Sequence, residues 1–384
     1  MGPSYRQGPR AGSRYYVPAA PSPAAIAAAR RKPPANRSNP TVQAIVIDRP
    51  GSYHRLQLRE LPDPQPRPGE LRIAVQHSGV NYADCVIRMG LYESAKRLVG
   101  WPITPGFEVA GLIDAVGDGV DGWRPGDRVL AVTLFGGYAS RLCVPAVQAF
   151  RIPAALDTAQ AAALPTIFLT AWFALHELAH LRRGERVLVH SAAGGVGSAA
   201  VQLAAQAGTE VTAVVGGAHK RELPQRLGAR HVIVKSEQAL WAEAGRIAPG
   251  GYDVILDPNG VETLGQSYAH LAPLGRLAIY GFHTMLPRQG GRPNWPKLAW
   301  DWLRTPRFDP LKLTVENRSV LGFNLSFLSE RADLLLPAMT QILAGIEAGR
   351  LQPPPLAIYP LSAVAEAHHA LESGQTQGKL ILAP

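Results

Sequence analysis

The chain has 384 residues, of which 46% are hydrophobic and 18% are charged, a composition typical of a globular protein of about two domains. Its two cysteines, Cys85 and Cys143, exclude a disulfide scaffold and any zinc site that needs three or four thiolates. The formal charge of +10 reflects 39 Lys and Arg against 29 Asp and Glu, a balance that by itself would suit a nucleic acid or an anionic surface as partner.

Most of the basic excess lies in residues 1–40. This segment has seven Arg and Lys, no Asp or Glu and eight Pro, which leaves 32 basic against 29 acidic residues in the rest of the chain. Little in it could offset the entropy lost on ordering, so we expect a disordered tail with at most a weak peripheral surface contact. An organellar transit peptide is the alternative, although the prolines oppose the amphipathic helix of such peptides. No recognition motif supports nucleic-acid binding.

The hydropathy of the chain argues against a membrane or secretory destination. No run approaches the roughly 18 apolar residues of a transmembrane helix, and the start lacks the apolar core of a secretory signal. We therefore expect a protein of the reducing cytoplasm without a transmembrane segment.

From residue 41 to about residue 160, short apolar runs alternate with Pro and Gly. This texture predicts a mostly β first domain. The expected strands cover residues 42–47, 72–80, 106–117, 127–132 and 138–145.

After about residue 161, strands and helices alternate, which predicts a parallel, doubly wound sheet. Its strands are continuous Val, Ile and Leu runs, as expected when helices cover both faces. A helix at 161–180 precedes this unit, and helices at 331–349 and 362–373 with a strand at 379–384 end the chain. The expected strands are 185–190, 210–215, 231–235, 253–257, 276–281 and 319–325, with helices at 197–208, 219–227, 237–247 and 261–271.

Residues 283–318 interrupt this alternation and carry Trp295, Trp300 and Trp302. Such a cluster could form a lid, a dimer contact or a surface that meets apolar substrates. Packing of a short helix into the core is an equally good interpretation.

A glycine-rich turn, SAAGGVG at 191–197, joins the strand 185–190 to the helix that follows. Glycines let the backbone approach a pyrophosphate, and the helix N-terminus supplies N–H donors and a positive dipole end. Because strand, turn and helix occur in the required order, we predict dinucleotide binding rather than a turn that needs glycine only for packing. The predicted contacts are Ser191, Gly194, Gly195, Val196 and Gly197.

The second strand of this unit ends at Val215 without the acidic residue that would bind a ribose 2′-hydroxyl. The residues that follow include Lys220 and Arg221, and cationic groups there suit a 2′-phosphate. We therefore predict NADPH, with Lys220 facing the 2′-phosphate. The alternative is that both cations are solvated residues of a helix start.

The segment HELAH at 176–180 matches the zinc-protease pattern H-E-x-x-H. We reject a zinc site for two reasons. The helix ends directly after this segment, in LRRG, and leads into the first nucleotide-binding strand, and no third ligand follows at a plausible spacing. The segment is interpreted as a connector helix.

The chain contains a long, ordered series of segments: SGVNYADCVIRMGLY (78–92), PITPGFEVAGLIDAVG (102–117), RPGDRVLA (124–131), GGYAS (136–140), LTAWFAL (169–175), VLVHSAAGGVGSAAVQLA (187–204) and QGKLILAP (377–384). In these segments, and over residues 42–384, the chain resembles the medium-chain dehydrogenase/reductase superfamily, and within it the zinc-free quinone oxidoreductase group. The later segments 253–260, 278–282 and 316–328 are most similar to the vesicle amine transport protein branch. Asn81 and Phe107 stand where zinc-dependent members have Cys and His, so we predict no metal.

The resemblance implies an α/β fold with a GroES-like, mostly β domain and a Rossmann domain. We expect a substrate and catalytic domain at 41–164, an NADPH-binding domain at 165–326 with the insert 283–318, and a return to the catalytic domain at 327–384.

The resemblance also implies roles near the reacting atoms. Tyr92 occupies a Gly-x-Tyr position like that of the active-site tyrosine of quinone and enoyl-thioester reductases, where a phenol can donate a proton; otherwise it is an aromatic that closes the cleft. Asn81 could donate an amide N–H to a substrate carbonyl, unless it only caps a turn. Asp84 is expected to orient its neighbours. Thr170 is expected beside the nicotinamide, or as a helix-interior hydroxyl.

Further cofactor contacts are expected at the carboxyl ends of later strands and near the chain end, each with a loop or packing role as the alternative. They are Asn259, Tyr280, Gly281, Phe323, Asn324 and Lys379.

Together these features predict an NADPH-dependent, zinc-independent reductase, a homodimer, that transfers hydride to a quinone or an α,β-unsaturated carbonyl. Two alternatives stay open. One is a trans-acting enoyl-thioester reductase of a biosynthetic pathway, and the other is a non-catalytic NADPH-binding sensor or adaptor.

Overall fold

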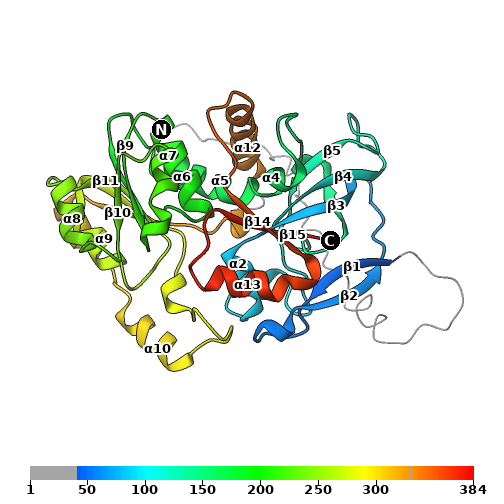
Figure 1. Ribbon diagram of the computed structural model, residues 1–384, viewed down its shortest axis with the longest axis horizontal. Coiled ribbons are helices and arrows are strands. Elements are labelled where there is room, and N and C mark those ends of the chain that lie inside the picture. Colours follow the sequence, from blue (N-terminus) through cyan, green and yellow to red (C-terminus); the bar gives the residue numbers. More distant parts are fainter. Residues whose placement is uncertain (1–40, 329–330) are drawn as a thin grey trace, which may run out of the picture.

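The computed structural model describes residues 41–328 and 331–384 (Figure 1). The predictions made for residues 1–40 lie outside the described residues. In Figure 1 two lobes lie side by side, and the last part of the chain, in red, crosses back between them.

The first lobe consists mainly of antiparallel strands, in a two-stranded pair, β1 with β2, and a seven-stranded sheet. The order in the larger sheet is β14-β15-β3-β4-β5-β7, with β6 paired to β3. Because β15 pairs with β3, the end of the chain lies beside Val80. The strands are β1 (Thr41–Val46), β2 (Gln57–Pro62), β3 (Glu70–Val80), β4 (Glu108–Val116), β5 (Arg128–Val132), β6 (Arg141–Pro145), β7 (Ala149–Arg151), β14 (Leu356–Pro360) and β15 (Lys379–Ala383).

The second lobe is built on a six-stranded parallel sheet in the order β10-β9-β8-β11-β12-β13, which confirms the expected α/β class. Its central strands are buried Val, Ile and Leu runs, as a sheet covered on both faces requires. The strands are β8 (Arg186–Val189), β9 (Glu210–Val215), β10 (His231–Val234), β11 (Tyr252–Asp257), β12 (Leu271–Ile279) and β13 (Ser319–Gly322).

Most helices of this lobe and of the chain end are shorter than the sequence pattern indicates, although α6 has the expected length. They are α6 (Gly195–Gln206), the 3-10 turn η4 (Ala218–Lys220), α7 (Glu222–Arg226), α8 (Leu240–Ile247), α9 (Leu264–Ala269), η6 (Leu325–Leu328), α12 (Ala332–Glu347), η7 (Leu361–Ala363) and α13 (Val364–Glu372).

The prediction of a single helix at 161–180 is wrong. The segment forms three helical elements: α4 (Thr158–Ala162), α5 (Pro165–Trp172) and the π-helix η3 (Phe173–Leu178). Pro165 lacks an N–H and so begins α5 rather than continuing α4.

One apolar core joins the two lobes. The largest cluster of buried side chains includes Leu130 and Ile381 from the antiparallel sheet and Val189 and Val254 from the parallel sheet. Helix α5 lies between them and contributes Ile167. Loops at the ends of both sheets are therefore held in fixed relative positions.

Several short elements in the first lobe were not predicted. They include the helices α2 (Tyr82–Arg88) and α3 (Glu93–Leu98) and the 3-10 turns η1 (Tyr53–Arg55) and η2 (Ala146–Gln148). Asn81 is the N-cap of α2, and the Asp84 carboxylate accepts from the Asn81 backbone N–H at 2.8 Å. A cap of this kind stabilises a helix too short to form by propensity alone.

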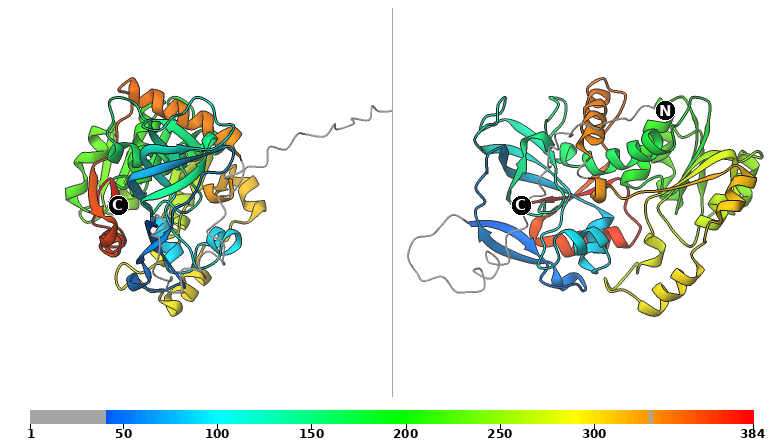
Figure 2. Two further views of the ribbon diagram at one scale, coloured as in Figure 1. Left: turned by 90° about the vertical axis from the view of Figure 1, so that its right-hand side faces the viewer. Right: turned by 180° about the vertical axis from the view of Figure 1, so that it is seen from behind.

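The insert 283–318 forms η5 (His283–Met285), α10 (Trp295–Arg304) and α11 (Pro310–Glu316), and Figure 2 shows it in yellow to orange at the edge of the second lobe. Its three tryptophans are 60–65% exposed, so the interpretation that they pack into the core is wrong. Leu298 of α10 instead packs on a buried cluster with Cys85 of α2. The insert thus contacts both lobes.

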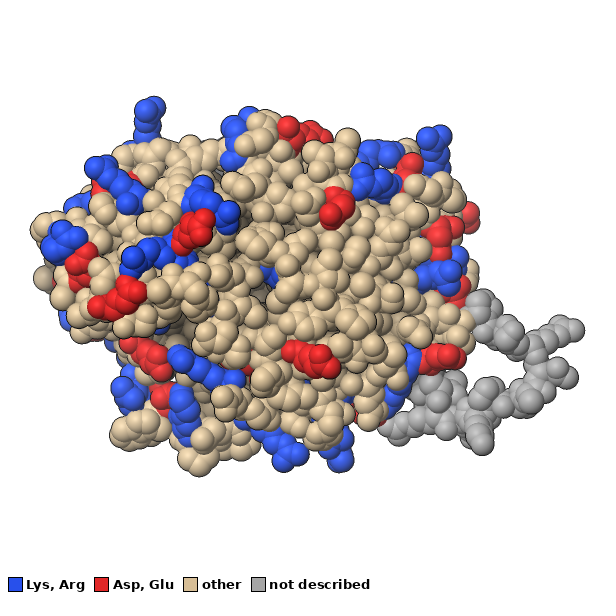
Figure 3. Space-filling model, viewed as in Figure 1, with Lys and Arg blue, Asp and Glu red and all other residues tan. Residues whose placement is uncertain are grey.

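Among the helices of the described residues, none is long and apolar enough to cross a bilayer. On the face drawn in Figure 3, Lys and Arg side chains alternate with Asp and Glu around the rim.

Candidate functional site

The glycine-rich turn follows β8 and leads directly into α6. Ser191 has a φ of 53°, and the Gly194 N–H bonds to the Ser191 carbonyl at 2.9 Å. A Cβ added to Gly197 would lie 2.3 Å from that carbonyl oxygen, so only glycine permits this turn. Helix α6 has no side-chain cap, and its first N–H groups remain donors for an anion. The residues present therefore fit a pyrophosphate.

The chain end lies against this turn. The Gly378 N–H donates to the Ala193 carbonyl at 2.8 Å, and Gly194 and Gly378 form a β-bridge. Residues of the last loop therefore border the predicted phosphate site.

Lys220 lies in η4, after β9, as the sequence places it. Its side chain is largely buried and its ammonium donates to the Gly374 carbonyl at 2.6 Å. Burial, and then repulsion by Lys235, lowers the pKa of Lys220. Lys235, which directly follows β10, was not among the predicted contacts. Arg221 is ion-paired with Glu237 instead.

Two predicted contacts meet at the carboxyl ends of β8 and β11. The Ser191 hydroxyl donates to the Asn259 Oδ1 at 3.1 Å. Asn259 is in turn placed by Asp257, whose buried carboxylate accepts from the Asn259 N–H at 2.8 Å and from the Thr263 hydroxyl at 2.7 Å. The loop after β11 is thereby fixed against the glycine-rich turn.

The loops after β12 and β13 lie at the same edge of the sheet. The rings of Tyr280 and Phe323 are 6.4 Å apart, and Phe323 also packs on Phe173, at 5.1 Å. Gly281 approaches the Pro258 carbonyl so closely that a Cβ would lie 2.8 Å from its oxygen. The predicted Tyr280, Gly281, Phe323 and Asn324 thus share the edge that carries Asn259.

Tyr92 connects the first lobe to that edge. Its hydroxyl lies 3.1 Å from the Asn324 Oδ1, to which it donates, and 2.8 Å from the Ser326 Oγ. Its ring packs against Phe107, with centroids 5.9 Å apart, and burial raises its pKa. The phenol therefore stays protonated at neutral pH. Ser326 was not predicted from the sequence.

Asn81 lies in a buried network that the sequence did not reveal. Its Nδ2 donates to the Glu108 Oε1 at 2.9 Å, and the Lys379 ammonium donates to its Oδ1 at 2.5 Å. The same ammonium lies 2.6 Å from the Glu108 carboxylate. Lys379 was expected at the cofactor, whereas these contacts turn it toward Asn81. The one signal for Glu108 was an acidic residue inside the apolar run 106–113.

Asp84 holds three groups at the start of α2. Its carboxylate accepts from the Asn81 N–H at 2.8 Å, the Gly106 N–H at 2.9 Å and the Tyr138 hydroxyl at 3.0 Å. Burial raises the pKa of Asp84 to about 7. These contacts suit an orienting role.

Thr170 lies in α5, where its hydroxyl donates to the Thr166 carbonyl at 2.7 Å. The Thr166 N–H in turn donates to the Glu108 Oε2 at 2.7 Å. Thr170 is therefore one turn of helix away from the Glu108 network.

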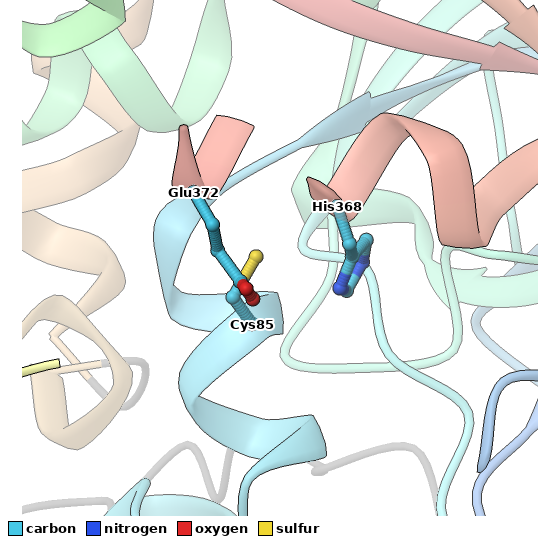
Figure 4. Close-up of side chains that lie close together, drawn as sticks. All are labelled: Cys85, His368 and Glu372. Atoms are coloured by element: carbon cyan, nitrogen blue, oxygen red, sulfur yellow. The ribbon is translucent and has the colours of Figure 1, made fainter. Parts of the chain in front are cut away.

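Outside this region, Cys85, His368 and Glu372 bring three ligand-type atoms within 4.8 Å of one another (Figure 4). Both Glu372 oxygens are already used, one by the Arg88 guanidinium and one by the Tyr53 hydroxyl at 2.5 Å. A guanidinium at the carboxylate repels a metal cation, so the cluster is interpreted as a clasp between α2 and α13. Burial lowers the pKa of His368 to about 3, which keeps it neutral.

The two histidines of the rejected zinc-protease pattern are placed apart from this clasp. His176, in the π-helix, packs against Trp172 at the end of α5, with tilted rings whose centroids are 4.4 Å apart. His180 follows the π-helix with a φ of 46°.

Comparison with known proteins agrees with this arrangement. A family description for alcohol dehydrogenase GroES-like domains matches residues 67–154, and one for zinc-binding dehydrogenases matches residues 227–382. The human synaptic vesicle membrane protein VAT-1 homolog is 34% identical over 345 residues, which are 89% of this chain and 86% of that protein.

Two solved structures share the fold. A quinone oxidoreductase from Escherichia coli complexed with NADPH has 28% identity and a TM-score of 0.77, covering 89% of this chain and 100% of that one. The CurK enoyl reductase has 27% identity and a TM-score of 0.77, covering 89% and 99%. With both domain types matched in order and a third of the residues shared with a full-length relative, the chain belongs to the medium-chain dehydrogenase/reductase superfamily of oxidoreductases, in the family of the VAT-1 homologues.

Proposed function

We propose that this protein is an NADPH-dependent reductase that transfers hydride to a quinone or an α,β-unsaturated carbonyl without a catalytic zinc ion. The observation that carries the proposal is the pair of hydrogen-bond donors, Asn81 and Tyr92, at the junction of the lobes. Tyr92 contacts Asn324 at the edge of the nucleotide-binding sheet. We also propose the functional division into residues 41–164 with 327–384 and residues 165–326.

The donor set supports zinc independence. Phe107 offers no ligand atom, and the Asn81 oxygen already accepts from the Lys379 ammonium at 2.5 Å. A second cation beside that ammonium would be repelled, because water screens the repulsion between like charges only weakly in a buried site.

The site also fits NADPH, whose nicotinamide supplies the hydride when bound. Gly197 lets the turn pass close to the Ser191 carbonyl and present the first N–H groups of α6, and Gly216 has no atom within 4 Å of an added Cβ. Lys220 and Lys235 place two cations at the ends of β9 and β10, which suits a 2′-phosphate. An acceptor that gains a hydride at carbon develops negative charge on its oxygen. Asn81 would stabilise that charge. Tyr92, whose hydroxyl donates to Asn324 in this structure, would supply a proton after turning from Asn324 to the acceptor oxygen.

Replacing Tyr92 by Phe should lower kcat for enone reduction by about 10²-fold, because the phenol proton is lost. Quinone reduction should change much less, since water can protonate that product. Steady-state rates with both acceptors measure the effect. Tyr359, another half-buried tyrosine of the first lobe, gives the matched control. An equal loss in Tyr359→Phe would contradict a proton-donor role for Tyr92.

Replacing Lys220 by Glu should raise the KM for NADPH by about tenfold or more, because a charge-assisted hydrogen bond to phosphate becomes a repulsion. The KM for NADH, which has no 2′-phosphate, should change much less. Arg226→Glu makes the same charge change at an exposed position of α7 and should alter neither value. An unchanged ratio of the two KM values in Lys220→Glu would refute the assignment.

One assay distinguishes the proposed reductase from two alternatives, an enoyl-thioester reductase and a non-catalytic NADPH-binding protein. The similarity to the CurK enoyl reductase favours enoyl-thioesters as a second substrate class. NADPH oxidation should therefore be followed with quinones, enones and a short enoyl-thioester. Turnover supports the reductase, and the acceptor with the highest kcat/KM identifies the class. Tight NADPH binding without turnover on any acceptor would instead favour a sensor or adaptor.

We also propose a homodimer. Strand β13 lies at the edge of the parallel sheet, and exposed Leu311 and Val315 of α11 lie just before it in the chain. Within the described residues no strand pairs with the outer edge of β13, and a sheet edge near exposed apolar side chains is a surface that a second copy could cover.

A further inference from the structure

We propose that Lys379 and Glu108 are positioning residues that fix the amide of Asn81, so that one of its N–H groups is presented to the substrate oxygen. This inference rests on the proposed function. It also gives Lys379 a different role from the cofactor contact that the family resemblance implies.

The two partners define the orientation of the amide chemically. A lysine ammonium can only donate, so the Asn81 atom 2.5 Å from Lys379 is the oxygen. A carboxylate can only accept, so the Asn81 atom 2.9 Å from Glu108 is the nitrogen. A flipped amide would face N–H to ammonium and oxygen to carboxylate, and both contacts would be repulsive.

This geometry leaves one donor of Asn81 available. The Nδ2 atom carries two N–H groups, and Glu108 accepts from one of them. Within residues 41–328 and 331–384, no other group accepts from this nitrogen. Asn81 is 8% exposed, so the remaining N–H is largely shielded from water, and a substrate oxygen would satisfy it.

The network is held rigidly from several elements. Lys379 begins β15, Asn81 directly follows β3 and Glu108 begins β4, and these three strands are neighbours in the sheet. The second Glu108 oxygen accepts from the Thr166 N–H at the start of α5, at 2.7 Å. A Cβ at Gly79 would lie 2.3 Å from the Glu108 Oε1, so this glycine is required for the approach.

The Lys379 charge also makes Asn81 a better donor. An ammonium on the amide oxygen draws electron density from the nitrogen, and hydrogen bonds in such a chain strengthen one another in a buried site. During reduction the acceptor gains a hydride at carbon, and the electron pair of its double bond moves to the oxygen. That oxygen accepts more strongly from Asn81 as it becomes negative, and a proton from Tyr92 or water completes the reduction.

The test is a double-mutant cycle between Lys379→Met and Asn81→Ala. We expect each single variant to lower kcat for the enone by about 10–100-fold, the range for groups that orient a reacting residue. If Lys379 acts through Asn81, adding Lys379→Met to Asn81→Ala should change kcat by less than about twofold. Lys379→Arg keeps the cation and should retain more activity than Lys379→Met.

A second readout separates this role from cofactor binding. The Kd for NADPH, from fluorescence titration, should stay within about twofold of the unmodified protein in Lys379→Met. The primary isotope effect with NADPH deuterated at the transferred position should rise, because hydride transfer becomes slower. The variant Lys379→Met/Glu108→Gln removes both charges and provides a folded test protein if the single variant is unstable.

The outcomes distinguish the two proposals. An active unmodified enzyme whose kcat is unaltered by Lys379→Met, or a NADPH Kd that rises tenfold or more, would overturn the positioning role alone. Independent, multiplicative losses in the cycle would overturn it as well. An unmodified protein that binds NADPH but reduces no acceptor would overturn the proposed function, and this role with it.

Discussion

Replacing Arg88 by Met should lower the free energy of unfolding by about 3–5 kcal/mol, the usual cost of leaving a buried charge without its partner. Arg88 and Glu372 are both almost fully buried and form an ion pair. Arg88 also donates to the Gly291 carbonyl at 2.7 Å, which connects the insert to α2. Urea denaturation of the purified variant measures the loss.

Two control variants test whether the loss of stability comes from the unpaired buried charge. Arg88→Met/Glu372→Met removes both charges and should recover most of the lost stability, because an apolar pair of similar volume needs no partner. Arg97→Met breaks a pair with Glu93 on the surface and should cost less than about 1 kcal/mol. A small effect of Arg88→Met, or no recovery in the double variant, would contradict the clasp.

Replacing Gly197 by Ala should weaken NADPH binding by about 10²-fold, which corresponds to about 2.7 kcal/mol. The added Cβ would lie 2.3 Å from the Ser191 carbonyl oxygen and 2.8 Å from the Ala192 Cα. Both atoms belong to the backbone, so the turn must open and the donors of α6 move. Fluorescence titration with NADPH measures the change.

Gly245 in α8 is the matched control, because a Cβ there meets no atom within 4 Å. Gly245→Ala should leave NADPH binding unchanged and stabilise the helix by about 0.5–1 kcal/mol. Unaltered NADPH affinity in Gly197→Ala would show that this turn does not bind the pyrophosphate.

The parallel half of the fold could be predicted closely, because its signals are local. The expected strand 210–215 has the bounds of β9 (Glu210–Val215), and the strand 253–257 lies within β11 (Tyr252–Asp257). A continuous apolar run predicts a buried strand, and a glycine-rich turn predicts the start of a helix, each from a few neighbouring residues. The short strands β2 and β14 were missed because their side chains are mostly exposed and give no apolar pattern.

Helices α2 and α3 were missed for a related reason. Each has at most seven residues, and α2 is stabilised by Asp84, whose other partners are Gly106 and Tyr138. Helices of that length depend on such tertiary contacts rather than on propensity.

The sequence by itself determined the kinds of group at the candidate site: a glycine-rich turn, an amide at Asn81, a phenol at Tyr92 and no carboxylate directly after Val215. Only the tertiary structure decided the partners of these groups. Lys379 is 298 positions from Asn81, and Arg88 is 284 positions from Glu372. Such pairs form because β15 returns to lie beside β3 and α13 packs on α2. Spacing along a chain carries no information about contacts that distant strands create on pairing, so a terminal lysine became a partner of Asn81 only in the folded protein.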